Sequence, residues 1–210
     1  LISFLIGERS NFIKVLIMII LFFFLFEKKF FKLKIILFSS FFIIIFLIIF
    51  NNINYKARFI NQMIKPIVTN NTFYFKNNPY VQHYAVALKV YDNNKIFGVG
   101  LKNYRIEVTK GTYKGLLAST HPHQLHFEVL AELGIFGYLI FMIFFLYHFY
   151  KYFKNQKSNN NLSLAGFLFV FTSLLPLLPS GSFFTSNAAA LFWMNFELMN
   201  LNKRNYNFLN

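Results

Sequence analysis

Long apolar runs alternate with short, mostly basic segments over most of this chain. Several runs are shorter than the roughly 20 residues that an untilted helix needs to cross a bilayer, but flanking aromatic and Lys side chains extend their reach. The pattern predicts an all-α integral membrane protein with about five transmembrane helices. The apolar runs are Phe12–Phe26, Ile35–Phe50, Val129–Tyr150, Leu162–Leu178 and Phe183–Leu201.

The connectors between the runs predict which side of the membrane each segment occupies. The short segments 27–34 and 151–161 and the tail after Leu201 carry Lys or Arg, which the positive-inside rule assigns to the cytoplasm. The stretch 51–127 is also basic, but loops longer than about 60 residues do not follow this rule. The predicted division is two transmembrane helices in 1–50, one large external loop in 51–127, and three transmembrane helices with a cytoplasmic tail in 128–210.

Composition agrees with a membrane environment. Of the 210 residues, 56% are hydrophobic, 21% aromatic and only 13% charged. A soluble fold of this size could not bury so much apolar surface, so the bilayer is the expected solvent. The formal net charge of +14 comes from basic clusters beside apolar runs, where they meet anionic head groups or substrates. Nucleic-acid binding is disfavoured, because no stretch alternates aromatic and basic residues.

Two further features of composition limit the interpretation. The chain contains no Cys, which excludes disulfides and thiolate metal sites. The chain begins with Leu rather than Met, and Leu1–Ile6 has the composition of the end of an apolar run. We therefore expect an N-terminally truncated fragment whose earlier helices are missing.

The long loop has a structure of its own in this interpretation. Tyr55–Ile67 has mixed helical spacing typical of an interfacial segment, and Tyr80–Val90 has helical spacing. Gly98–Gly100 predicts a turn, and Leu101–Val108 a short strand. Loops longer than about 15 residues are usually functional or disordered, and the many aromatic residues here argue against disorder.

The densest group of reactive side chains lies at the end of this loop. His121, His123 and His126 fall within six residues, just before the third apolar run. Pro122 favours an extended His121, which would place His121 and His123 on one side. Spacing alone leaves three interpretations open: a metal site completed by Glu128, amphipathic side chains at the membrane interface, or a general base.

The sequence around this cluster resembles a known family. Residues 121–134, HPHQLHFEVLAELG, are similar to the HPHN-x-x-x-x-x-L-A-E-x-G stretch of the O-antigen ligase family. In that family nine residues separate a His followed by Asn, Ser or Gln from Gly-x-x-Gly, as nine residues separate His123-Gln124 from Gly134–Gly137 here. Three more stretches resemble family motifs in the right order: Gly7–Ser10, Ala87–Arg105 and Leu178–Phe184.

The resemblance implies an activity. Relatives are O-antigen ligases, O-antigen polymerases and similar glycosyltransferases of the bacterial inner membrane that use lipid-linked glycans. It implies a GT-C-like fold and an inverting, metal-independent transfer without a cofactor. The glycan would move from undecaprenyl pyrophosphate to lipid A–core or another glycan acceptor. The loop 51–127 would then be periplasmic and carry the catalytic segment.

The resemblance also implies roles for individual residues. His123 would be the general base for the acceptor hydroxyl, and Glu132 would orient His123 or a sugar hydroxyl. Arg9 and Arg105 would bind the diphosphate, for which the planar guanidinium is well suited. His83 and His121 are further candidates for substrate binding, although many relatives carry an Arg near the position of His83.

Other interpretations of these residues and of the chain stay open. Arg9 also fits an interfacial anchor, and Arg105 a solvated loop charge. O-antigen polymerase shares donor and architecture with the ligase. A non-enzymatic transporter subunit is disfavoured, because four of the five runs have almost no charge near their centres. A zinc membrane hydrolase is disfavoured because the chain lacks His-Glu-x-x-His.

Overall fold

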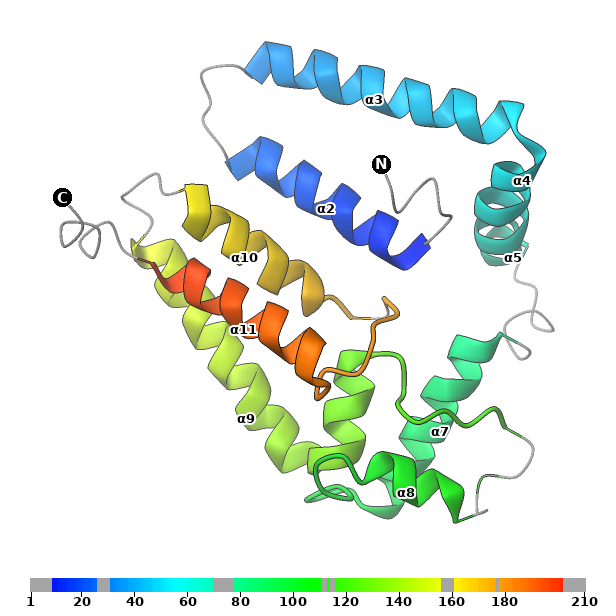
Figure 1. Cartoon of the computed structure of the whole chain (residues 1–210), viewed down its shortest axis with the longest axis vertical. Coiled ribbons are helices and arrows are strands. Elements are labelled where there is room, and N and C mark those ends of the chain that lie inside the picture. The colour runs from blue at the N-terminus through cyan, green and yellow to red at the C-terminus, as the bar shows by residue number, and fades with distance from the viewer. Residues whose placement is uncertain are drawn as a thin grey trace. The chain divides into compact units, whose positions relative to one another are not determined.

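The computed structural model describes residues 9–25, 31–69, 78–110, 113, 116–155, 161–176 and 178–201. Every regular element within these ranges is a helix (Figure 1). The chain divides into two compact units, Leu1–Asn77 and Asn78–Asn210, which are described separately. The predicted boundaries at residues 50 and 127 concern membrane topology and stay a prediction.

The N-terminal unit is built on the first two apolar runs. These form helices α2 (Arg9–Leu25) and α3 (Phe31–Asn51), as the sequence predicts. A helical segment follows, made of α4 (Ile53–Tyr55), the π-helix η2 (Lys56–Ile64) and α5 (Lys65–Val68). Helical structure is thus confirmed for the predicted interfacial segment.

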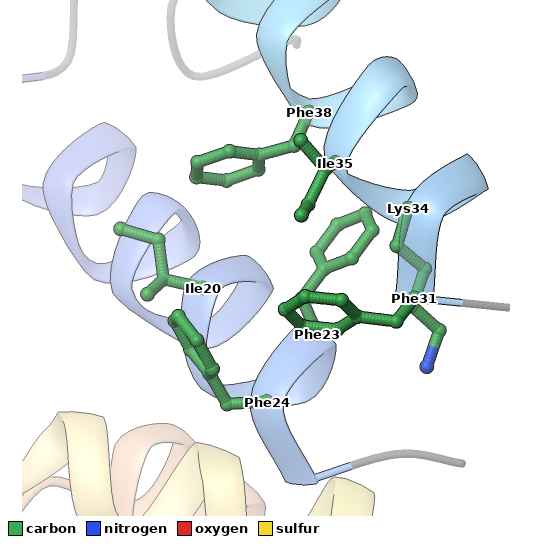
Figure 2. A pocket seen from close by; sticks show the side chains of 7 residues that line it. All are labelled: Ile20, Phe23, Phe24, Phe31, Lys34, Ile35 and Phe38. Carbon is green, nitrogen blue, oxygen red and sulfur yellow. The ribbon is translucent and has the colours of Figure 1, made fainter. Parts of the chain in front are cut away.

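Phe59 of η2 packs in a buried cluster that joins η2 to α2 and α3. It is buried with Phe12 of α2 and Ile45 of α3, and its ring meets that of Phe12 edge-on at 5.7 Å between centroids. Toward the other ends of α2 and α3 lies a small apolar pocket of about 150 Å³. Figure 2 shows its lining: Ile20, Phe23, Phe24, Phe31, Lys34, Ile35 and Phe38.

The remaining apolar runs form three helices of the second unit. They are α9 (Leu125–Asn155), α10 (Asn161–Ser173) and α11 (Ser186–Asn200). α10 and α11 pack so closely that a Cβ at Gly166 would meet the backbone of Asn195 and Met199. The missing side chain of Gly166 allows this approach. Among the described residues, Phe31–Asn51 and Leu125–Lys154 are long and apolar enough to cross a membrane. The five-span arrangement stays a prediction.

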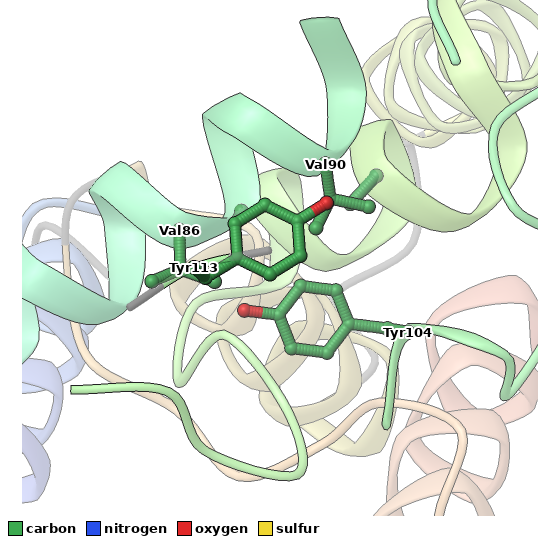
Figure 3. Packing of buried hydrophobic residues seen from close by; sticks show 6 residues of the cluster. Val86, Val90, Tyr104 and Tyr113 are labelled. Carbon is green, nitrogen blue, oxygen red and sulfur yellow. The ribbon is translucent and has the colours of Figure 1, made fainter. Parts of the chain in front are cut away.

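The loop preceding α9 contains two helices that form a core with it. α7 (Pro79–Asn93) confirms the predicted helix, which continues to Asn93. Figure 3 shows Val86 and Val90 of α7 directed toward the rings of Tyr104 and Tyr113. This cluster also includes Ala131 of α9, so α7 packs against the start of the third apolar run.

The predicted strand at Leu101–Val108 is wrong, since the chain forms a turn and then helix α8 (Tyr104–Thr109). Lys102 has a left-handed backbone with φ of 59°, which ends any extended run there. Tyr104 and Val108 are four residues apart, and both pack into the core from one helical face. The apolar positions therefore follow helical rather than strand periodicity.

Helix α9 is broken at Gly134, where φ is 66° and ψ is −172°. Figure 1 shows its two arms meeting at a sharp angle. The break removes helical hydrogen bonds, and the segment Lys95–Gly100 replaces them. Val99 N and Gly100 N donate to Ala131 O and Glu132 O, at 3.1 and 2.8 Å. Lys95 O and Ile96 O accept from Ile135 N and Phe136 N, at 2.8 and 3.2 Å.

Two glycines make this backbone pairing possible. Gly98 and Gly134 both have positive φ, and a Cβ on either would lie 2.6 Å from the backbone nitrogen of the other. Only glycine combines that conformation with such a close approach. The Gly98–Gly100 turn and the break in α9 are therefore one structural feature.

Candidate functional site

A cavity of about 330 Å³ lies in the second unit, between the turn before α8, the first arm of α9 and the connector before α11. It brings together three of the predicted site residues, Arg105, His121 and Glu132. Its other lining residues are Lys102, Thr120, Glu128, Ser182, Phe184 and Thr185.

The charged side chains of the cavity differ in exposure. Lys102 and Arg105 are exposed to solvent. Glu128 and Glu132 are only 2% and 3% exposed. They lie four residues apart on one face of α9, as their spacing predicts. The cavity therefore combines accessible cations with buried carboxylates.

Protein donors fix both carboxylates in place. Glu132 Oε2 accepts from the backbone nitrogen of Lys102 at 2.7 Å. Glu128 accepts from the Ser182 hydroxyl through Oε1 and from Phe183 N through Oε2, the latter at 2.8 Å. Glu128 thereby ties α9 to the connector that precedes α11. The structure thus shows Glu132 bonded to the turn before α8, whereas the sequence interpretation has it orienting His123 or a sugar hydroxyl.

His83, His121 and His123 form a compact imidazole cluster beside the cavity. The ring of His123 lies 4.0 Å from that of His121 and 4.9 Å from that of His83, between centroids. The prediction that His121 and His123 share one side is confirmed. His121 lines the cavity, and its buried Nε2 has no hydrogen-bond partner within the described part of the chain.

His123 occupies an unusual backbone position. Its φ is 57°, in a region that non-glycine residues rarely adopt, so the segment is not extended at this residue. The His123 carbonyl accepts from Ser180 N at 2.8 Å, which joins it to the connector before α11. Its Nε2 meets the Ser119 hydroxyl at 3.1 Å. A hydroxyl group therefore fits against this nitrogen.

Burial and neighbouring imidazoles disfavour the charged forms of these histidines. Burial, followed by His121 and His83, lowers the pKa of His123 from its ordinary value to about 4. Burial and His83 also lower the pKa of His121. Both rings are consequently neutral at neutral pH and have a lone pair to accept a proton.

Helix α7 positions the segment that leads into the cluster. His83 Nδ1 lies 2.8 Å from Leu117 O, and Gln82 Oε1 accepts from Leu117 N at 2.9 Å. Because a carbonyl only accepts, His83 Nδ1 carries a proton and, in the neutral ring, Nε2 is the acceptor. His83 thus contacts His123 while anchoring the chain that precedes it.

The other conspicuous residues of the motif have structural contacts. Gln124 is buried, and its Oε1 accepts from Phe127 N at 2.9 Å, which caps the first turn of α9. His126 bridges Leu174 O at 2.7 Å and the Tyr138 hydroxyl at 3.1 Å. His126 therefore connects the first arm of α9 with its second arm and with the end of α10.

Arg9 belongs to the N-terminal unit, where it begins α2. Its Nη1 donates to Arg58 O and Gln62 O of η2, at 3.4 and 3.5 Å. Its predicted role in diphosphate binding stays a prediction.

The described residues contain no group of three or more His, Cys, Asp or Glu side chains arranged to hold a metal ion. The His-rich segment thus offers an imidazole pair beside a polar cavity. The proposed independence from metal ions stays a prediction.

Several cavity residues are not apparent from sequence reasoning. Lys102 lies within Ala87–Arg105 and Ser182 within Leu178–Phe184, two stretches that resemble family motifs, yet neither residue is distinguished there from ordinary polar residues. The pairs Lys102–Glu132 and Glu128–Ser182 are 30 and 54 residues apart in sequence. Their proximity depends on the break in α9 and on the return of the chain before α11.

Comparison with known proteins identifies the family of this chain. No curated protein and no solved structure matches the chain. A family model described as O-antigen ligase matches residues 1–142, which include α7, α8 and the first arm of α9. This match covers more than half of the chain, and the chain belongs to the O-antigen ligase family.

Proposed function

We propose that this protein is an O-antigen ligase that transfers a polysaccharide from undecaprenyl pyrophosphate to lipid A–core. Family membership supports a membrane glycosyltransferase that uses lipid-linked glycans. The observation that carries the proposal is the cavity itself, in which accessible cations and buried carboxylates meet beside neutral imidazoles. A glycosyl diphosphate presents the matching groups, namely an anionic leaving group and a sugar rich in hydroxyls.

The cations bind the donor in this proposal. Arg105 offers a planar set of N–H donors to the diphosphate, and its exposure leaves that group accessible. Arg9 is proposed as a second diphosphate-binding residue on the basis of its family motif. Sugar hydroxyls donate to the free lone pairs of Glu128 and Glu132, each of which already accepts from the protein.

The chemical step is a single displacement with inversion. The acceptor hydroxyl attacks the anomeric carbon, and the bond from this carbon to the diphosphate oxygen breaks. His123 accepts the hydroxyl proton, and the diphosphate leaves with the electron pair, stabilised by Arg105. The Ser119 hydroxyl occupies the position at His123 Nε2 that the acceptor hydroxyl would take. The proposal includes no metal ion or cofactor.

The bound donor also assists the base. A pKa of about 4 keeps His123 unprotonated, but it makes a free imidazole a weak base. The negative charge of a diphosphate in the adjacent cavity favours the protonated form and raises the pKa of His123 toward neutrality. His123 therefore gains basicity when the donor is bound.

The decisive experiment is the surface glycan of a bacterial strain that lacks this gene. A ligase predicts loss of all long chains from lipid A–core, with polymer accumulating on undecaprenyl pyrophosphate. A single repeat unit on the core would identify an O-antigen polymerase instead. An unchanged glycan profile would contradict both. The proposed site lies on the periplasmic face of the inner membrane, where both substrates are available.

A further inference from the structure

The turn between Gly100 and α8 is held by a single residue of α9. The Glu132 carbonyl accepts from Gly100 N at 2.8 Å, and its carboxylate accepts from Lys102 N at 2.7 Å. Within the turn, Asn103 N donates to Gly100 O at 3.1 Å. Lys102 has a φ of 59°, a conformation that a Lys adopts only where the surroundings enforce it.

This arrangement presents two cations to one cavity. Lys102 and Arg105 are three residues apart, both are exposed, and both line the cavity. Lys102 precedes α8, and Arg105 lies in its first turn. Because Glu132 fixes the backbone of this turn, it also positions the backbone from which the Lys102 and Arg105 side chains extend.

The two carboxylates of the cavity leave Lys102 and Arg105 able to bind an anion. Glu132 and Glu128 are buried and accept hydrogen bonds from protein donors, whereas Lys102 and Arg105 are exposed to solvent. An anion that enters from solvent therefore meets the cations first. A diphosphate carries enough oxygen atoms to bind a guanidinium fork and an ammonium together.

We propose that Lys102 is a diphosphate-binding residue that acts beside Arg105, and that Glu132 is the positioning residue for both. This inference rests on the proposed function, since the diphosphate is the leaving group of the donor. In this inference Glu132 positions Lys102 and Arg105 and takes no part in the proton transfer.

Binding of inorganic pyrophosphate to the purified full-length protein tests the proposal. Lys102→Met should weaken binding about tenfold or more, the effect of losing a hydrogen bond to a charged group. Lys102→Gly should do the same while keeping the left-handed backbone, and Lys102→Arg should retain most binding. Lys110→Met is the matched control, because Lys110 follows α8, pairs with Glu107 and does not line the cavity.

Glu132 requires two variants. Glu132→Gln keeps an acceptor oxygen for Lys102 N and should bind pyrophosphate within about threefold of the unaltered protein. Glu132→Ala should weaken binding about as much as Lys102→Met. Equal, severe loss of binding in both variants would overturn the positioning role, since an acceptor oxygen for Lys102 N would then make no difference.

Further outcomes separate this proposal from the proposed function. Binding to Lys102→Met equal to that of the Lys110 control would overturn it, as would the absence of saturable pyrophosphate binding to the unaltered protein. His123→Ala should lower transfer by about 10²–10⁴-fold but keep pyrophosphate binding within about threefold of the unaltered protein. If instead His123→Ala transfers normally while Lys102→Met binds poorly, the proposed mechanism fails and the anion site stands.

Discussion

Burial and the neighbouring imidazoles keep His123 neutral, which gives a prediction for the pH dependence of activity. The kcat/KM profile reports groups of the free enzyme, so its acidic limb should fall near pH 4, where His123 becomes protonated. His83→Gln removes one neighbouring imidazole, while the amide can still donate to Leu117 O. This variant should raise the pKa of His123 and move the limb to a higher pH, while burial and His121 keep it below 6.5. An acidic limb already near 6.5 in the unaltered protein would contradict the prediction.

The same depressed pKa has a consequence for stability. Between about pH 6.5 and 4 the unfolded chain binds a proton at His123 that the folded protein does not. The contribution of this residue to stability is therefore complete above 6.5 and declines as the pH falls toward 4.

The three histidines of the motif should respond differently to substitution. His123→Ala removes the proposed base and should lower the transfer rate by about 10²–10⁴-fold without changing membrane insertion. His126→Ala removes the contacts to Leu174 O and Tyr138, so it should lower thermal stability more than the rate of the remaining folded protein. His121→Ala should be intermediate, because His121 lines the cavity and its ring lies 4.0 Å from that of His123, between centroids.

The measurement is transfer from a lipid-linked donor by each purified full-length variant, with melting temperature recorded in the same detergent. Equal loss of activity in all three variants would indicate a structural or metal role for the whole cluster.

At the scale of elements, the pairing of Gly98 with Gly134 predicts a strong response to a single methyl group. Gly134→Ala would place an alanine with positive φ against Ile96 O. It should lower the free energy of unfolding by about 1–3 kcal/mol or more. Gly181→Ala is the matched control, since nothing lies within 4 Å of a Cβ there. Chemical unfolding in detergent measures both. A Gly134→Ala protein as stable as the control would contradict the description of the break.

The helices differ in how far the sequence predicts them. Each of the five apolar runs and Tyr80–Val90 contains a helix, because periodicity and composition determine those elements locally. The last two helices are shorter than their runs, since α10 ends at Ser173 and α11 begins at Ser186. The turn and helix at Leu101–Thr109 are not predicted, since the eight residues of the expected strand, Leu101–Val108, have mixed spacing that fits either period. The break at Gly134 is also missed, because a glycine in an apolar run ordinarily allows close helix packing. Only the approach of Gly98, 36 residues earlier, gives it a second role.

The candidate site shows the same division between local and distant information. Motif resemblance identifies Arg105, His121 and Glu132, which the structure brings to one cavity. Lys102 and Ser182 enter the site through backbone geometry and contacts with distant carboxylates, which no local pattern encodes.

At the scale of the whole molecule, the proposed topology can be tested directly because the chain lacks native Cys. Lys89 is exposed on α7, in the loop that we place in the periplasm, and Lys151 is exposed near the end of α9, on the proposed cytoplasmic side. Lys89→Cys should react with a membrane-impermeant maleimide in cells whose outer membrane alone is permeable. Lys151→Cys should react only after the inner membrane is opened. The reverse pattern would invert the topology.

The break in α9 has a consequence for hydrophobic matching. The whole helix has 31 residues and would extend about 46 Å if straight, well beyond the roughly 30 Å of a hydrocarbon core. The 21 residues from Ile135 to Asn155 extend about 32 Å, which fits that thickness. The short arm from Leu125 to Leu133 is then free to leave the membrane normal, and it carries Glu128 and Glu132 with it. In the topology that we propose, Ile135–Asn155 is the spanning segment, and both carboxylates lie outside the hydrocarbon.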